Sequence, residues 1–271
     1  MLRALALLSL MLVPGGAAAG RIEAEALDDL PGAQVVILGE FHDNSAHHAN
    51  QARTLAALKP AAIVFEMLTP DQAARVTEGN RDDPHALAAA LDWAASGWPD
   101  FAMYHPLFTA APGARIVGGA LPRETVRRAV REDPAKIFGP EAARFGLDRP
   151  LAADEQAARE AEQMQAHCDA LPAGLLPGMV AAQRLRDTAL ARATLVALEA
   201  TGGPVAIITG NGHARVDRGI PAALAHAHPG LDVLSIGQLE AAPDGGEVPY
   251  DLWLVTDPAE RGDPCAGFLP D

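Results

Sequence analysis

The sequence predicts an α/β fold with a mostly parallel central sheet and helices on both of its faces. Three observations lead to this prediction. Short apolar runs that indicate buried strands alternate along the chain with helical stretches. Several of these runs are apolar throughout, which is typical of strands that are covered on both faces in a parallel sheet. The 271 residues are also 49% hydrophobic, which is enough for the core of one large domain.

The first 19 residues have the pattern of a secretory signal peptide. Arg3 gives an early positive charge, an apolar run follows over residues 4–13, and small residues at 17–19 resemble a cleavage site. The apolar run is shorter than the roughly 20 residues that a bilayer span needs, so no stable membrane span is expected after removal of the signal. We therefore expect a periplasmic or secreted protein with a single mature domain over residues 20–271.

The first predicted strand ends in an acid and an imidazole. The apolar residues 35–38 form this strand, and Glu40 and His42 follow it. A helix is predicted from Ser45, with Asn44 or Ser45 able to cap its first free N–H groups. Glu40 and His42 should therefore lie in a loop at the carboxyl end of a strand, where ligands bind in open α/β sheets.

Three further predicted strands also lead to ionisable residues. They cover residues 61–65, 115–119 and 205–209, and they are followed by Glu66, Arg123 and His213, respectively. His42 and His213 each close a Gly-x-x-His pattern. Arg123 near a helix start indicates a carboxylate partner or an anionic ligand, because the helix dipole favours acids there. Since parallel strands end at one edge of a sheet, all these residues should gather there.

Residues 124–200 are predicted to form a helical subdomain inserted into the sheet. Its long helices cover residues 153–170 and 178–200. On the second helix, one face carries Met179, Gln183 and Arg186, and this face either lines the crevice or is solvated.

Two other side chains are candidates for a ligand site. His167 on the first long helix either looks into a pocket or is structural. Tyr104 belongs to an aromatic-rich stretch in a chain with only 4% aromatic residues, and this stretch either packs a subdomain or approaches a ligand.

The end of the chain completes the predicted sheet. Strands are expected over residues 231–236 and 252–256, and the Pro- and Gly-rich loop between them is too short for a crossover helix, so we expect an antiparallel edge hairpin. Cys168 and Cys265 either pair, as an oxidising compartment allows, or remain separate buried thiols. The net charge of −14 argues against nucleic acid and anionic lipid as partners.

Three kinds of chemistry fit the expected cluster. Histidines and carboxylates can hold a catalytic zinc or manganese ion, with His42, His213, Glu40 and Glu66 as the candidate ligands. Without a metal, either histidine can act as a general base that a glutamate orients. A cleft with apolar walls can instead hold a flat cofactor whose iron is ligated by His, Tyr or Met. The spacing alone does not choose among them.

These residues resemble the ChaN-type haem-binding uptake proteins of the Tiki superfamily. The superfamily resemblance rests on the two Gly-x-x-His motifs and the intervening Glu66. The closer resemblance to the ChaN branch lies in residues 39–51, Leu121-Pro122-Arg123, His167-Cys168, residues 179–187 and residues 210–215, and it spans about residues 34–257. It implies an envelope protein that binds haem for iron acquisition, with an erythromycin-esterase-like α/β fold. Some members bind haem at a homodimer interface.

Two functions follow as expectations. The first is a periplasmic haem-binding protein in which Arg123 or Arg186 pairs with the haem propionates. Tyr104, His167 or Met179 would then approach the iron, with Gln183 on the same face as Met179. The alternative is a hydrolase, metal-dependent or not, that uses Glu40, His42, Glu66 and His213. An inherited hydrolase site would explain the ionisable cluster better than haem binding does.

Overall fold

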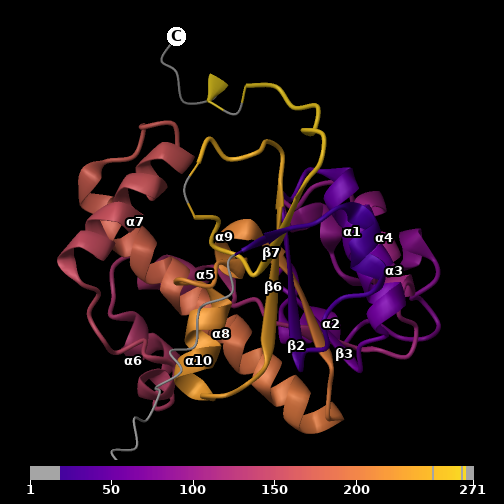
Figure 1. Ribbon diagram of the computed structural model, residues 1–271. Coiled ribbons are helices and arrows are strands. Elements are labelled where there is room, and N and C mark those ends of the chain that lie inside the picture. The colour runs from indigo at the N-terminus through magenta and orange to yellow at the C-terminus, as the bar shows by residue number, and fades with distance from the viewer. Residues whose placement is uncertain (1–18, 246, 264, 267–271) are drawn as a thin grey trace, which may run out of the picture.

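The computed structural model describes residues 19–245, 247–263 and 265–266 (Figure 1). Residues 1–18 of the expected signal peptide lie outside them. The centre is a seven-stranded sheet with the order β1-β7-β6-β2-β5-β3-β4. All neighbouring strands are parallel. The strands are β1 (Gly20–Arg21), β2 (Val35–Glu40), β3 (Ala62–Phe65), β4 (Arg115–Gly118), β5 (Val205–Gly210), β6 (Val233–Leu239) and β7 (Leu252–Val255). The predicted α/β class is confirmed.

Helices cover both faces of the sheet, so the central strands bury apolar side chains on both of their faces. Val36 and Leu38 of β2 belong to one buried cluster, whereas Val35 and Ile37 belong to the other. The first cluster includes side chains of α1 (Ser45–Leu58), α3 (Pro84–Ala90) and α4 (Phe101–Thr109). The second includes side chains of α5 (Arg123–Ala129), α6 (Pro134–Phe138), α8 (Leu176–Thr201) and α10 (Ile220–Ala227). The short helices α2 (Pro70–Ala73) and α9 (Asn211–Ala214) follow β3 and β5.

The predicted helical insertion is present, and α8 attaches it to the sheet. This helix packs against β3, β4 and β5, and it carries α5, α6 and α7 (Ala153–Ala166) on its outer side. None of the side chains of α7 is fully buried. The position of α7 therefore depends on few apolar contacts. No helix in the described part of the chain is both long and apolar enough to span a membrane.

The expected antiparallel hairpin at the end of the chain is wrong, because β7 runs parallel to β6. The connection over residues 240–251 is long enough to return to the start of the sheet edge, although its described residues, 240–245 and 247–251, form no helix. Tyr250 is buried at the end of this connection, and its ring lies directly against Gly237 of β6. Burial of this ring favours the parallel return over a tight turn. The short β1 then pairs with β7.

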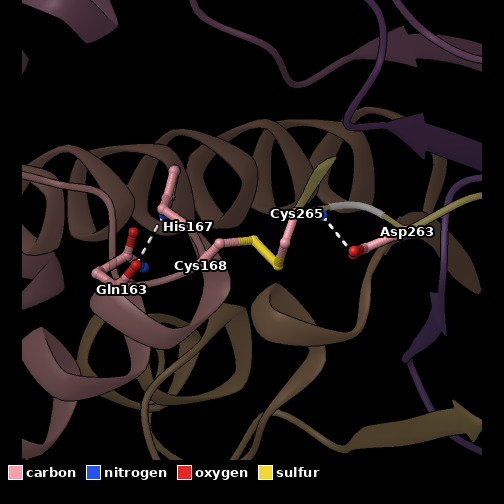
Figure 2. Close-up of a disulfide and its surroundings, with 5 residues drawn as sticks. All are labelled: Gln163, His167, Cys168, Asp263 and Cys265. Atoms are coloured by element: carbon pink, nitrogen blue, oxygen red, sulfur yellow. Dashed lines mark hydrogen bonds between the residues drawn. A yellow bond between two sulfur atoms is a disulfide. The ribbon is translucent and has the colours of Figure 1, made fainter. Parts of the chain in front are cut away.

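Cys168 and Cys265 form a disulfide (Figure 2). Of the two alternatives that the sequence left open, the structure shows the pair. The bond joins the turn after α7 to the segment after β7, across a sequence separation of 97 residues.

We expect the double substitution Cys168→Ser and Cys265→Ser to lower the free energy of unfolding by about 2–4 kcal/mol, because the unfolded chain gains the freedom of a large open loop. Urea unfolding without reductant measures this change. Wild-type protein unfolded in the presence of a dithiol is the matched control and should have the same stability as the variant. Equal stability of the variant and the oxidised wild type would contradict the expectation.

Candidate functional site

The carboxyl ends of β2, β3 and β5 bring the predicted ionisable residues together. Glu40, the last residue of β2, lies beside Gly210 of β5, and Phe65 of β3 lies beside Ile208 of β5. Glu66 therefore follows β3 directly at this edge, next to Thr209. Of the predicted catalytic set, Glu40, His42, Glu66 and His213 all meet here.

Glu66 is the centre of the cluster and is only 3% exposed. Its Oε1 atom lies 2.5 Å from Nη2 of Arg186, 3.5 Å from Nε2 of His213 and 3.9 Å from Nε2 of His42. Its Oε2 atom accepts hydrogen bonds from the Thr209 hydroxyl and the Gly210 N–H, both at 2.7 Å. Burial alone would raise the pKa of Glu66, but the surrounding positive groups hold it far below its usual range. Glu66 is therefore a carboxylate at neutral pH.

His42 is held by Glu40 and packs against an aromatic side chain with its ring tilted. Its Nδ1 atom lies 2.8 Å from Oε1 of Glu40, and its ring centroid lies 4.7 Å from that of Trp98. Burial would lower the pKa of His42, but the hydrogen bond with Glu40 and the charge of Glu66 raise it above its usual value. The raised pKa means that His42 takes up a proton more readily than a free imidazole does, and its Nε2 atom faces Glu66.

A second layer of buried side chains fixes Glu40. Nδ1 of His48 lies 3.1 Å from Oε2 of Glu40, but at an angle that leaves this oxygen without a hydrogen-bond partner among the described residues. Nε2 of His48 contacts the backbone oxygen of His42 at 2.9 Å. The Tyr104 hydroxyl donates to the same backbone oxygen at 3.1 Å and to Glu40 at 3.4 Å. Burial, with Glu40 nearby, raises the pKa of Tyr104, so this residue is a neutral donor inside the core.

His213 has a carboxylate partner of its own, which the sequence did not identify. Its Nδ1 atom lies 2.5 Å from Oδ1 of Asp187, and both side chains are only 5% exposed. Burial raises the pKa of Asp187 against the opposing effect of His213. Nε2 of Gln183 lies 3.1 Å from the same imidazole nitrogen. Gln183 and Asp187 are one helical turn apart on α8, and this spacing is the signal that could have indicated a shared role.

His47 fastens the loop that carries His42. Its Nδ1 atom accepts a hydrogen bond from the Phe41 N–H at 2.8 Å, so its other nitrogen, 2.9 Å from the Thr256 hydroxyl, is the one that carries the proton. His47 is fully buried, and burial lowers its pKa from 6.5 to about 4.

Because the folded protein binds this proton less readily than the unfolded chain, His47 stabilises the fold fully above pH 6.5 and progressively less as the pH falls to about 4. We expect the free energy of unfolding to fall less in the His47→Gln variant than in the wild type as the pH drops from 6.5 to about 4. The two decreases should differ by about 3 kcal/mol. Urea unfolding at pH 7 and pH 4.5 measures it. His42 and His48 are present in both proteins, so their contributions to the pH dependence cancel in the comparison. If the stability of the variant and of the wild type changes with pH in parallel, His47 is not the group responsible.

A cavity of about 580 Å³ opens beside Glu66. Three guanidinium groups line it, those of Arg123, Arg127 and Arg186, and the apolar part of its wall includes Met67, Trp98, Leu121, Val126 and Leu190. Arg123 donates to the backbone oxygen of Ser96 and forms no ion pair in the described part of the chain. The cavity has the size and the mixed lining of a small-molecule site.

Four predicted ligand residues lie outside this cavity, and one of them is Gln183, which lies beside His213. Tyr104 is in the core, as described above. His167 ends α7, and its Nδ1 atom contacts the backbone oxygen of Gln163 at 2.8 Å (Figure 2). Met179 is half-buried on the first turns of α8. The structure therefore brings Arg123 and Arg186 to the cavity but does not bring these four residues there.

The predicted metal ligands are not arranged as a metal site among the residues that the structure describes. The residues that the structure describes contain no group of three or more His, Cys, Asp or Glu side chains arranged to hold a metal ion. Arg186 already occupies the open side of Glu66 at Oε1. A guanidinium at this position supplies the positive charge that a cation would otherwise bring.

Comparisons with known proteins identify a family and similar folds. The family model described as haem-binding uptake, Tiki superfamily, ChaN matches residues 26–224. Among solved structures, a protein described as "Cofacial heme binding to ChaN of Campylobacter jejuni" is 18% identical, with a TM-score of 0.61 over 84% of this chain and 88% of that chain. The type III effector HopBA1 is 13% identical, with a TM-score of 0.47 over 87% and 92% of the two chains.

A search of curated proteins gives no match to the sequence. The family model nevertheless covers well over half of the chain, including both Gly-x-x-His motifs and the helices between them. The resemblance seen in the sequence is thus confirmed, and the chain belongs to the ChaN haem-binding uptake family of the Tiki superfamily.

Proposed function

We propose that the protein is an exported haem-binding protein associated with haem or iron uptake. Family membership supports haem as the ligand. The observation that carries the proposal is the 580 Å³ cavity, where apolar side chains and three arginines lie together. A porphyrin presents the matching chemistry, a flat apolar ring with two carboxylates, and guanidinium groups pair well with carboxylates.

The residues of the cavity fit haem in two respects. Arg186 is already engaged with Glu66, so the exposed Arg123 and Arg127 at the rim are assigned to the propionates. Met67 lines the same cavity, and its thioether belongs to the side-chain types that bind haem iron. The proposal therefore assigns Met67 to the iron in place of Tyr104, His167 or Met179.

Export is the second part of the proposal. The signal-like sequence of residues 1–19 supports it, and so does the disulfide, because such bonds persist in oxidising compartments. Expression of the full-length chain, followed by fractionation and mass measurement of the mature N-terminus, tests it. A protein retained in the cytoplasm with residues 1–19 intact would contradict export.

Titration with haem tests the main proposal. We expect a saturable shift of the Soret band in the wild type, with an end point that gives the number of haem molecules per chain. The mass of the complex in solution shows whether two copies share the bound haem, as the family resemblance implied. A Soret band that never saturates would reject haem as the ligand.

A second candidate function is a hydrolase, and one observation favours it. Two imidazoles, His42 and His213, face one oxygen of Glu66, and each is paired through Nδ1 with a buried carboxylate. Such pairing fixes the orientation of a general acid or base. Arg186 at Glu66 favours a metal-free version. An ester and peptide panel tests this candidate, with His42→Ala and His213→Ala as controls and metal analysis of the wild type. If the panel shows no turnover that is lost in His42→Ala or His213→Ala, the hydrolase is rejected.

A further inference from the structure

The segment after β7 crosses the carboxyl edge of the sheet, above the site. We call residues 256–263 together with Cys265 the strap, and residues 41–44 the His42 loop. Figure 1 shows α7 and α1 on opposite sides of this edge, with the strap passing over it. The strap is attached at both of its ends to elements that flank the site.

One attachment is to the His42 loop. Arg261 donates to both carboxylate oxygens of Asp43, at 2.6 and 2.8 Å, and also to Glu240 at 2.6 Å. Its guanidinium carbon lies 5.8 Å from the centre of the Phe41 ring. Such a bidentate pair within a network of charges holds its geometry better than an isolated surface ion pair.

Uncharged contacts strengthen this attachment. The side chain of Asn44 donates to the backbone oxygen of Asp257 at 3.0 Å, while its oxygen caps the start of α1. His47 bridges the Thr256 hydroxyl and the Phe41 N–H, as described above. The residues on both sides of His42 are therefore tied to the strap.

The other attachment is the disulfide between Cys265 and Cys168 (Figure 2). Cys168 and Asp169 both have a left-handed backbone, with φ values of 57° and 56°, which non-glycine residues rarely adopt. Because α7 has no fully buried side chain, few apolar contacts hold this turn in place. Both cysteines are half-buried, so a soluble dithiol can reach them.

We propose that the strap is a redox-controlled clamp that holds the His42 loop in position while the disulfide is intact. A thiolate of a dithiol reductant attacks one sulfur of the Cys168–Cys265 bond, and the other sulfur leaves as a thiolate that takes up a proton. The second thiol of the reductant then resolves the mixed disulfide, so that the reductant is oxidised and both cysteines become thiols. The strap loses its anchor at the turn after α7, and the His42 loop gains mobility beside Trp98. The clamp itself does not depend on the proposed function, and only its expected effect on haem binding rests on that proposal.

Hydrogen exchange of the full chain, followed by mass spectrometry, tests the clamp without any ligand. Treatment with dithiothreitol should raise exchange in peptides that cover residues 41–48 by roughly fivefold, and the Cys168→Ser, Cys265→Ser variant should show the same rise without reductant. Peptides of β2 and β5 should exchange as in the oxidised protein, which shows that the fold is retained. Unchanged exchange at residues 41–48, with a rise confined to α7, would overturn the proposal.

Arg261→Met separates the two attachments. In the oxidised variant, residues 41–48 should already exchange faster while α7 stays protected, and reduction should then add little at residues 41–48. If reduction of the Arg261→Met variant raises exchange at residues 41–48 as much as it does in the wild type, the disulfide acts on the His42 loop by another route. That result would overturn the clamp. Haem titration of the oxidised and reduced wild type is a separate readout, in which reduction should weaken binding by roughly threefold. If haem does not bind at all, the proposed function fails while the exchange result still decides the clamp.

Discussion

Replacing Glu66 with glutamine is expected to lower the free energy of unfolding by about 3–5 kcal/mol, which is the usual cost of removing one partner from a buried ion pair. The side chain is 3% exposed, and its charge compensates the guanidinium of Arg186, with Nε2 of His42 also nearby. A glutamine amide would leave this guanidinium without compensation. Its carbonyl oxygen can still accept the hydrogen bonds that Thr209 and Gly210 now donate to Oε2, but its NH₂ group then faces the guanidinium of Arg186, donor against donor. Urea unfolding at pH 7 measures the loss.

A double-mutant cycle shows whether the loss comes from the ion pair. We expect Glu66→Gln combined with Arg186→Met to be less destabilising than the sum of the two single substitutions, because the second change removes the uncompensated charge. Asp92→Asn is a matched control, since Asp92 lines the same cavity but is exposed and should change stability by less than about 0.5 kcal/mol. A Glu66→Gln variant as stable as this control would contradict the central role of Glu66.

Replacing Arg123 or Arg127 with leucine is expected to weaken haem binding by roughly tenfold for each residue, because a hydrogen bond between charged groups contributes about 1.5–3 kcal/mol. Both guanidiniums line the cavity, and neither is assigned to Glu66. The titration that follows the Soret band gives the dissociation constants. The double substitution should weaken binding further.

Arg149→Leu provides the control for this prediction. Arg149 is also exposed, but it lines a separate cavity of about 300 Å³. The same change of charge should leave haem affinity within about twofold, because a charge outside the cavity is screened by solvent. If Arg149→Leu weakens binding as much as Arg123→Leu does, the effect reflects net charge, and the assignment of the propionates is wrong.

Much of the fold could be predicted from local pattern. The runs over residues 35–38, 61–65 and 205–208 are apolar throughout, and this pattern is typical of strands that are buried on both faces. Parallel strands end at the same edge, so the residues that follow them meet regardless of the details of packing. For this reason the meeting of Glu40, His42, Glu66 and His213 was predictable, and so was the class of fold. The direction of β7 was not, because loop composition does not show that Tyr250 packs against Gly237.

The tertiary structure alone decided which side chains complete the site. Arg186, and not Arg123, reaches Glu66, and Asp187 reaches His213, because α8 packs across β3, β4 and β5 and turns both residues toward the strand ends. A helix-face pattern gives the spacing of residues but not the rotation at which the helix docks. The sequence by itself determined the strands and the polar groups at their ends, since these depend on residues that are close in the chain. The partners of those groups depend on packing between elements that lie far apart in the chain.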